Sequence, residues 1–132
     1  MTAHNILIAD DHPLFREALK LALAKTGRPH RTLEAASLQD ALAIAQETAA
    51  LDLILLDLRM PDAEGFSGLA QLHAEQPHTP ILVVTGATQA NAPALAHQYG
   101  AVGFVSKSEP LETIATRIEA ALSGHVDQSF AA

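Results

Sequence analysis

Short apolar runs and segments of helical periodicity alternate along the whole chain. The clearest apolar runs have four residues without polar alternation, at 6–9, 53–56 and 81–84, and a shorter run covers 104–105. Uninterrupted apolar runs of this length are typical of strands that are covered on both faces. A weaker segment at 31–35 is predicted to be an edge strand.

The segments that follow these runs carry apolar residues at the spacing of one helix face. Pro13 suits a first helical turn, and Gly100 stands at a position where a helix stop is preferred. Helices are therefore predicted at 13–25, 38–48, 65–76, 93–99 and 111–122. In the first helix, the residues predicted to face inward are Leu14, Ala18, Leu21 and Ala22.

Strict alternation of strand and helix, repeated five times, predicts an α/β fold with a parallel sheet and helices on both faces. The 132 residues suit one compact domain, and a content of 48% hydrophobic and 17% charged residues favours a folded chain. We place this domain at 1–124 and interpret 125–132 as a tail or the start of a linker.

Composition excludes several classes of function. The formal net charge is −7 without a basic cluster, so the segment lacks the electrostatic signature of a nucleic-acid binder. There is no cysteine, which excludes disulfides, thiol catalysis and iron–sulfur clusters. The seven histidines are scattered without the close spacing of a zinc site, and most are predicted to be single surface residues. We see neither a signal peptide nor an apolar run that could span a bilayer, so we expect no membrane contact and a cytoplasmic protein.

Polar residues follow four of the five predicted strands. They are Asp10 and Asp11, Asp57, Thr85 and Lys107. In an open parallel α/β sheet the binding site lies at the carboxyl ends of the strands, where these side chains would meet. Three carboxylates there repel one another without a cation, and Mg²⁺ prefers oxygen ligands. Phosphoryl transfer needs such an ion together with a fixed ammonium and a hydroxyl donor, which Lys107 and Thr85 can supply.

Each of these residues also has a purely structural interpretation. Asp10 and Asp11 could cap the helix that follows, and Asp57 could form a turn. Lys107 alone is more often a solvated lysine, and Thr85 alone a threonine at a strand end. Their joint placement at the ends of four strands favours a functional site.

Four segments resemble the receiver domains of response regulators, specifically those of LuxR-type (NarL-type) transcription factors. The segments are 10–19, 55–62 with the following Gly65, 83–86 and 100–107, and the likeness extends over about 4–123. The resemblance implies a flavodoxin-like (βα)5 doubly wound sheet with five parallel strands in the order 2-1-3-4-5. It also implies a signalling domain rather than an enzyme, one that catalyses only its own phosphoryl transfer and autodephosphorylation.

The resemblance further implies a role for each matching residue. Asp57 would accept a phosphoryl group from a histidine kinase. Mg²⁺ (or Mn²⁺) would be bound by Asp11 directly, by Asp10 through water, by Asp57 and by the backbone carbonyl of Arg59. The phosphoryl group would contact Lys107 and Thr85. Phe104 would then turn inward and reshape the surface formed by the fourth helix, the fifth strand and the fifth helix.

The expected partners also follow from the resemblance. They are a histidine kinase and, consistent with the family, a phosphorylation-dependent homodimer. DNA would be contacted only through a helix-turn-helix output domain that is absent from these 132 residues, so we expect the chain to be a receiver fragment rather than a stand-alone receiver. Three positions depart from common family patterns. Gly86 leaves the phosphoryl site open, and the side chain of Arg59 could overhang it. Ser108 stands where many receivers outside this subfamily have proline, so a cis peptide bond after Lys107 is not assumed.

Alternative functions on the same fold remain open. A Mg²⁺-dependent phosphatase with an aspartate nucleophile needs a second acidic residue two positions beyond it, where this chain has Arg59. A flavin-binding electron carrier would lack obvious aromatic walls, since the chain has no Trp and one Tyr. A receiver-like module that binds partners without being phosphorylated is the main remaining alternative.

Overall fold

The computed structural model describes residues 3–86 and 90–124. Within these residues, five strands form one parallel sheet in the order β2-β1-β3-β6-β7. Their bounds are β1 His4–Ala9, β2 His30–Ala35, β3 Leu53–Leu56, β6 Ile81–Thr85 and β7 Gly103–Ser106. Counted by appearance along the chain, this order is 2-1-3-4-5, so the predicted topology is confirmed.

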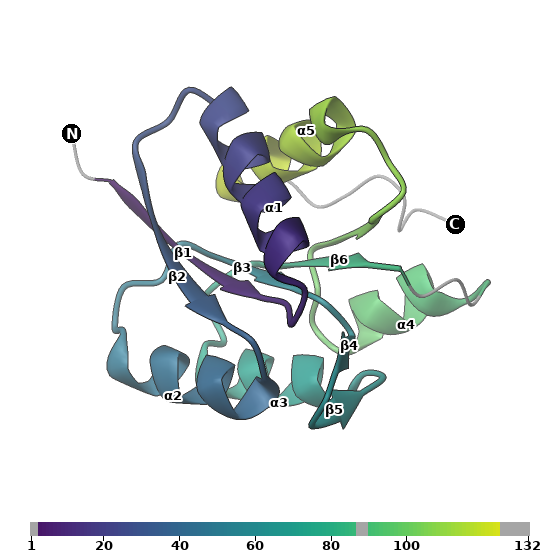
Figure 1. Cartoon of the computed structure of the whole chain (residues 1–132). Helices are drawn as coiled ribbons and strands as arrows, with labels where there is room; N and C mark the ends of the chain where they lie inside the picture. The colour runs from purple at the N-terminus through teal and green to yellow at the C-terminus, as the bar shows by residue number, and fades with distance from the viewer. Residues whose placement is uncertain (1–2, 87–89, 125–132) are drawn as a thin grey trace.

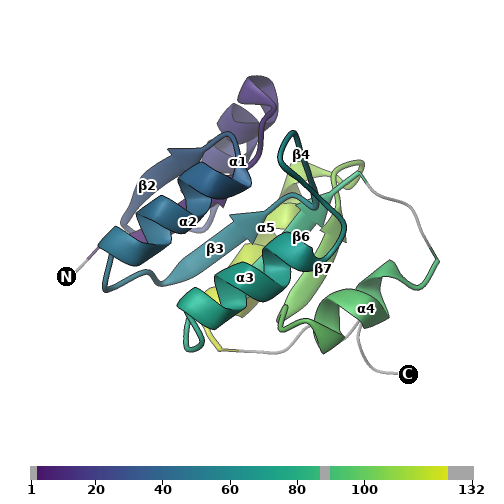
Figure 2. The same cartoon turned by 90° about the horizontal axis from the view of Figure 1, so that it is seen from below.

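Helices cover both faces of the sheet, as Figures 1 and 2 show. One face carries α1 and α5, and the other carries α2 and α3, while α4 packs beside β7. The bounds are α1 Pro13–Lys25, α2 Leu38–Glu47, α3 Ser67–Glu75, α4 Ala92–Gln98 and α5 Leu111–Leu122.

The core consists of two apolar clusters separated by the sheet. Successive side chains of a strand point to opposite faces. Accordingly, Ile6 and Ile8 of β1 join the cluster under α1 and α5, whereas Leu7 joins the cluster under α2 and α3. All four residues of β3 are buried, as expected for a central strand covered on both sides.

The predicted inward face of α1 was partly wrong. Leu14 and Leu21 are 86% and 60% exposed, and the helix instead buries Leu19, Ala22 and Leu23. Apolar residues occupy much of the circumference of this helix, so its periodicity fits more than one stripe. Packing against α5 and the sheet selects the stripe that contains Leu19.

A short hairpin between β3 and α3 was not predicted. It pairs β4 Arg59–Met60 with the antiparallel β5 Ala63–Glu64. Gly65, which follows the hairpin, has a φ of 77°, outside the helical region, and α3 begins at Ser67, two residues later than predicted. The stop after α4 is confirmed, since Gly100 has a φ of 109°, a conformation that residues with a Cβ rarely adopt.

Among residues 3–86 and 90–124, no helix has the length and apolar character needed to cross a membrane. The predicted tail or linker at 125–132 lies outside the described residues.

Candidate functional site

The hydrogen bonds of the sheet bring four predicted residues to one edge. Asp10 directly follows β1 and Asp57 directly follows β3, while Thr85 ends β6 and Lys107 follows β7. The ladder continues into the site, since the N–H of Asp57 donates to the carbonyl of Ala9 (2.9 Å) and the N–H of Lys107 to that of Thr85 (3.0 Å). The register of the parallel strands thus aligns the residues that carry the chemistry.

Asp57 is the centre of this group. It is 3% exposed, and each of its carboxylate oxygens has a separate set of donors. Oδ1 accepts a hydrogen bond from the hydroxyl of Thr85 (2.7 Å) and one from the backbone N–H of Arg59 (3.1 Å). Oδ2 lies 2.9 Å from the ammonium of Lys107. The carboxylate is therefore held in one orientation within a largely buried site.

Lys107 is the ammonium that balances the buried carboxylates. Its Nζ lies 2.9 Å from Asp57 Oδ2, 2.9 Å from Asp10 Oδ2 and 4.7 Å from the centroid of the Phe15 ring. Burial lowers the pKa of Lys107, but the hydrogen bonds and charges of Asp10 and Asp57 outweigh burial and raise that pKa above its ordinary value. The lysine is thus charged at neutral pH, where its ammonium lies between the two carboxylates.

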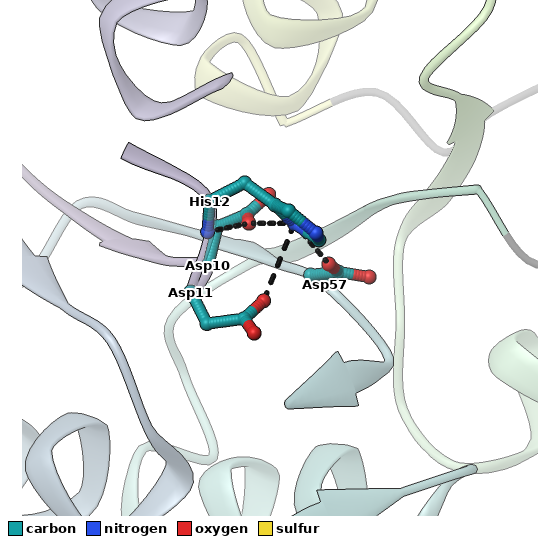
Figure 3. Close-up of side chains that lie close together, drawn as sticks. All are labelled: Asp10, Asp11, His12 and Asp57. Atoms are coloured by element: carbon teal, nitrogen blue, oxygen red, sulfur yellow. Dashed lines mark hydrogen bonds and ion pairs between the residues drawn. The ribbon is translucent and has the colours of Figure 1, made fainter. Parts of the chain in front are cut away.

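The acidic residues form a group that could hold a metal ion. Figure 3 shows Asp10, Asp11, His12 and Asp57 pointing toward one another, and one ligand atom from each lies within 4.8 Å of the others. The buried Oδ1 of Asp11 accepts no hydrogen bond from the described residues, and the buried Oδ2 of Asp10 has the Lys107 ammonium 2.9 Å away as its partner. Buried carboxylate oxygens without hydrogen bonds suit a hard divalent cation.

The structure places the other predicted residues nearby. Arg59, in β4, has an exposed side chain, and its backbone adjoins Asp57. Phe104, in β7, is half-buried against the cluster under α2 and α3, and its carbonyl accepts a hydrogen bond from Arg117 (3.0 Å). Gly86 is exposed, and a Cβ there would meet no atom within 4 Å. The Lys107–Ser108 peptide bond is trans.

Two residues that contact the site, His12 and Arg16, were missed by the sequence analysis. His12 was grouped with the scattered surface histidines, yet its ring contacts the carboxylates. Arg16 donates to the backbone carbonyl of Asp10 (2.7 Å) and pairs with Glu34 (2.8 Å), so the weak edge strand does contribute to the site. The sequence offered one signal for each residue. His12 directly follows Asp11, and Arg16 lies about one helical turn beyond His12.

A second carboxylate supports the loop beyond Asp57. Asp62 accepts hydrogen bonds from the first backbone N–H groups of α2, those of Leu38 (2.8 Å) and Gln39 (2.9 Å). These bonds hold the pKa of Asp62 below its ordinary value. Asp62 thus fixes the hairpin that follows Asp57 to the start of α2.

Comparisons with known proteins agree with this geometry. Residues 6–119 match the family model of the response regulator receiver domain. The chain is 42% identical over 123 residues to the glycerol metabolism activator of Pseudomonas putida and 32% identical over 123 residues to the transcriptional regulatory protein YdfI of Bacillus subtilis. Each alignment covers 93% of this chain but only 56% and 57% of those proteins, so the chain spans somewhat more than half their length.

A solved structure shows the same fold. The two-component response regulator of the LuxR family from Aurantimonas sp. SI85-9A1 is 30% identical, with a TM-score of 0.81 over 98% of this chain and 94% of that one. A doubly wound parallel sheet with an acidic site at its carboxyl edge, together with the family match over residues 6–119, defines the class as a response regulator receiver domain. The chain belongs to the response regulator receiver domain family, and it is the receiver domain of a two-component response regulator.

Proposed function

We propose that Asp57 is the phosphoacceptor of this receiver and that it takes its phosphoryl group from a phosphohistidine of a histidine kinase. The observation that carries the proposal is the arrangement around Asp57: a buried carboxylate with Thr85 and Arg59 donating to one oxygen and Lys107 contacting the other. Donors fixed in advance around an oxygen that gains charge are the main requirement of phosphoryl transfer.

Asp57 and Lys107 have different roles in the proposed transfer. A carboxylate oxygen of Asp57 forms a P–O bond to the phosphorus as the P–N bond to the kinase imidazole breaks. The ammonium of Lys107, already 2.9 Å from Asp57, neutralises part of the charge on the phosphoryl oxygens. The fixed carboxylate loses little orientational freedom when it reacts, because its donors hold it in place.

Mg²⁺ (or Mn²⁺) fits the oxygen-rich group at this edge. We assign its protein ligands to Asp11, to Asp57, to the backbone carbonyl of Arg59 and, through water, to Asp10. When bound, the ion would neutralise the carboxylates and the phosphoryl oxygens. The support is the grouping of ligand atoms from these carboxylates within 4.8 Å, with the buried Oδ1 of Asp11 accepting no hydrogen bond from described residues.

The output of the domain would be a change on the surface formed by α4, β7 and α5. Thr85 donates to Asp57 in this structure, and we propose that its hydroxyl moves to a phosphoryl oxygen after transfer, with Phe104 following inward. Moving a two-state equilibrium almost completely takes about 5 kcal/mol, whereas one hydrogen bond to a charged group contributes about 1.5–3 kcal/mol. A dimer partner or an output domain would supply the rest.

The extent of the whole protein is also a proposal. Residues 1–124 would form the receiver, and 125–132 would begin the connection to a DNA-binding output domain outside this chain. The support is that the curated relatives are nearly twice as long as the aligned segment. DNA would then be contacted by the output domain alone.

Incubation with acetyl phosphate, with and without Mg²⁺, tests the proposal. Intact mass spectrometry should show one phosphoryl adduct in the wild type that requires Mg²⁺ and is absent from Asp57→Asn. Asp40→Asn, on the exposed face of α2, is the matched control and should react like the wild type. Failure of the wild type to form an adduct under any condition would instead favour a receiver that binds partners without being phosphorylated.

A further inference from the structure

His12 lies at the mouth of the acidic site, and the proposed transfer gives it no role. It precedes α1 as the N-cap residue, but its side chain makes no capping hydrogen bond within the described structure. Its backbone N–H donates to Asp10 Oδ1 (2.8 Å), which brings the ring over the carboxylates. The side chain is 61% exposed, so its orientation is not imposed by burial in the core.

The ring nitrogen Nδ1 of His12 lies close both to carboxylate oxygens, which accept hydrogen bonds, and to an ammonium, which donates them. His12 Nδ1 lies 3.0 Å from Asp10 Oδ1, 3.2 Å from Asp11 Oδ1 and 3.0 Å from the ammonium of Lys107. A ring nitrogen either donates one proton or offers one lone pair. If Nδ1 carries the proton, it faces an ammonium that can only donate. If Nδ1 is bare, it faces two carboxylate oxygens that can only accept.

A cation among these atoms removes the conflict. A lone pair on Nδ1 and the lone pairs of the carboxylates can all point at one positive ion. Adjacent ligands of an octahedral ion stand about 3 Å apart when each bond is about 2.1 Å long. The separation from Nδ1 to the direct ligand Asp11 (Oδ1, 3.2 Å) matches that spacing, and the other direct ligand, Asp57 Oδ2, lies 3.8 Å from Nδ1.

Buried carboxylate oxygens point to a ligand independently of the histidine. Asp11 Oδ1 is buried and accepts no hydrogen bond from the described residues. Asp10 is 1% exposed, and its Oδ2 has the Lys107 ammonium 2.9 Å away as its partner. The histidine therefore adds a nitrogen ligand beside a buried carboxylate oxygen of Asp11 that still lacks a partner of this kind.

We propose that His12 Nδ1 is a metal ligand that gives this site a preference for d-block divalent cations (Mn²⁺, Co²⁺, Ni²⁺ or Zn²⁺) over Mg²⁺. The inference rests on the proposed function, since it refines which ion the phosphorylation site takes. Imidazole nitrogen is a good ligand for d-block ions, whereas Mg²⁺ keeps oxygen ligands and several waters. Because the ring is exposed, it can also swing aside and leave an all-oxygen site to Mg²⁺.

The test compares wild type, His12→Ala and His78→Ala, the last being a control at an exposed histidine in the turn before β6. Pulsed electron paramagnetic resonance on the Mn²⁺-loaded protein should show a directly coordinated ¹⁴N in the wild type and in His78→Ala but not in His12→Ala. Calorimetric titration should show that His12→Ala lowers the ratio of Co²⁺ to Mg²⁺ affinity at least about 10-fold, since even indirect partners of metal ligands contribute that much.

Contrary outcomes separate the two proposals. Mn²⁺ that binds to the wild type without a ¹⁴N coupling would overturn the role of His12 and leave the oxygen-ligated metal site standing. A ¹⁴N coupling that persists in His12→Ala would also overturn it, because another histidine would be the ligand. A wild type that binds neither Mn²⁺ nor Mg²⁺ would overturn the metal site itself, and the proposed function with it.

Discussion

Replacing Lys107 by methionine should destabilise the folded domain markedly in the absence of a divalent cation. The substitution keeps an unbranched side chain of similar length against Phe15 but removes the ammonium that lies 2.9 Å from both Asp10 and Asp57. These two carboxylates are 1% and 3% exposed, so they would remain largely buried without an opposite charge.

The size of the effect follows from this burial. Removing one partner of a buried ion pair costs about 3–5 kcal/mol, because the other charge is left uncompensated. Since the Lys107 side chain is 17% exposed, water screens part of the interaction, and we expect a loss of about 2–3 kcal/mol. With a urea m-value of about 1–3 kcal/mol per molar, the unfolding midpoint should fall by about 1–3 M.

Urea unfolding at neutral pH in EDTA measures this loss. Lys25→Met is the matched control, because Lys25 is exposed and its Nζ lies 3.7 Å from the carboxylate of Glu112, which is more exposed still. That variant should change the free energy of unfolding by less than about 0.5 kcal/mol. A loss below about 1 kcal/mol for Lys107→Met, or an equal loss in the control, would refute the reasoning.

The pH dependence provides an independent check on Lys107. The folded-state pKa of this lysine is raised above 10.5, so its stabilising contribution is fully present below that pH and is lost as the pH rises through the folded-state value. The difference in stability between wild type and Lys107→Met should therefore be constant from pH 7 to 10 and shrink at higher pH. A difference that shrinks between pH 7 and 9 would contradict this assignment.

Three further predictions concern the supports of the site. Thr85→Val should lower the free energy of unfolding by about 1.5–3 kcal/mol in urea, because it removes a buried hydroxyl donor from Asp57, while Thr85→Ser should preserve most of it. Arg16→Ala removes the hydrogen bond that holds the backbone of Asp10 and should weaken Mg²⁺ binding about 10-fold in calorimetry. Arg31→Ala, at an exposed arginine, is the control and should bind Mg²⁺ as the wild type does. The folded-state pKa of Asp62 is lowered, so the stability advantage of wild type over Asp62→Ala should be present at pH 6 and decline below about pH 4; an advantage that grows in acid would contradict it.

The sequence predicted the placement of the main site residues because that placement follows from topology. Asp57, Thr85 and Lys107 stand at the ends of apolar runs, and parallel strands bring their carboxyl ends to one edge. No side-chain conformation has to be known for this inference. Each of these three residues accordingly lies at the carboxyl edge of the sheet.

The supporting contacts could not be predicted because they depend on loop and side-chain geometry. His12 reaches the carboxylates only because its backbone N–H binds Asp10, and Asp62 caps α2 from a segment more than twenty positions away. Leu14 satisfied the helical pattern but is exposed, since the pattern alone does not say which of two apolar stripes meets the sheet. The four residues of β4 and β5 were too short a signal to be seen.

The most direct test of the central claim is to locate the phosphoryl group. The protein is phosphorylated with acetyl phosphate and Mg²⁺ and then reduced with sodium borohydride, which converts an aspartyl phosphate to homoserine, and its peptides are sequenced by mass spectrometry. We predict homoserine at position 57 alone, and none when Mg²⁺ is withheld. Homoserine at Asp10 or Asp11 instead of Asp57, or a phosphoryl group on any other kind of side chain, would contradict the account.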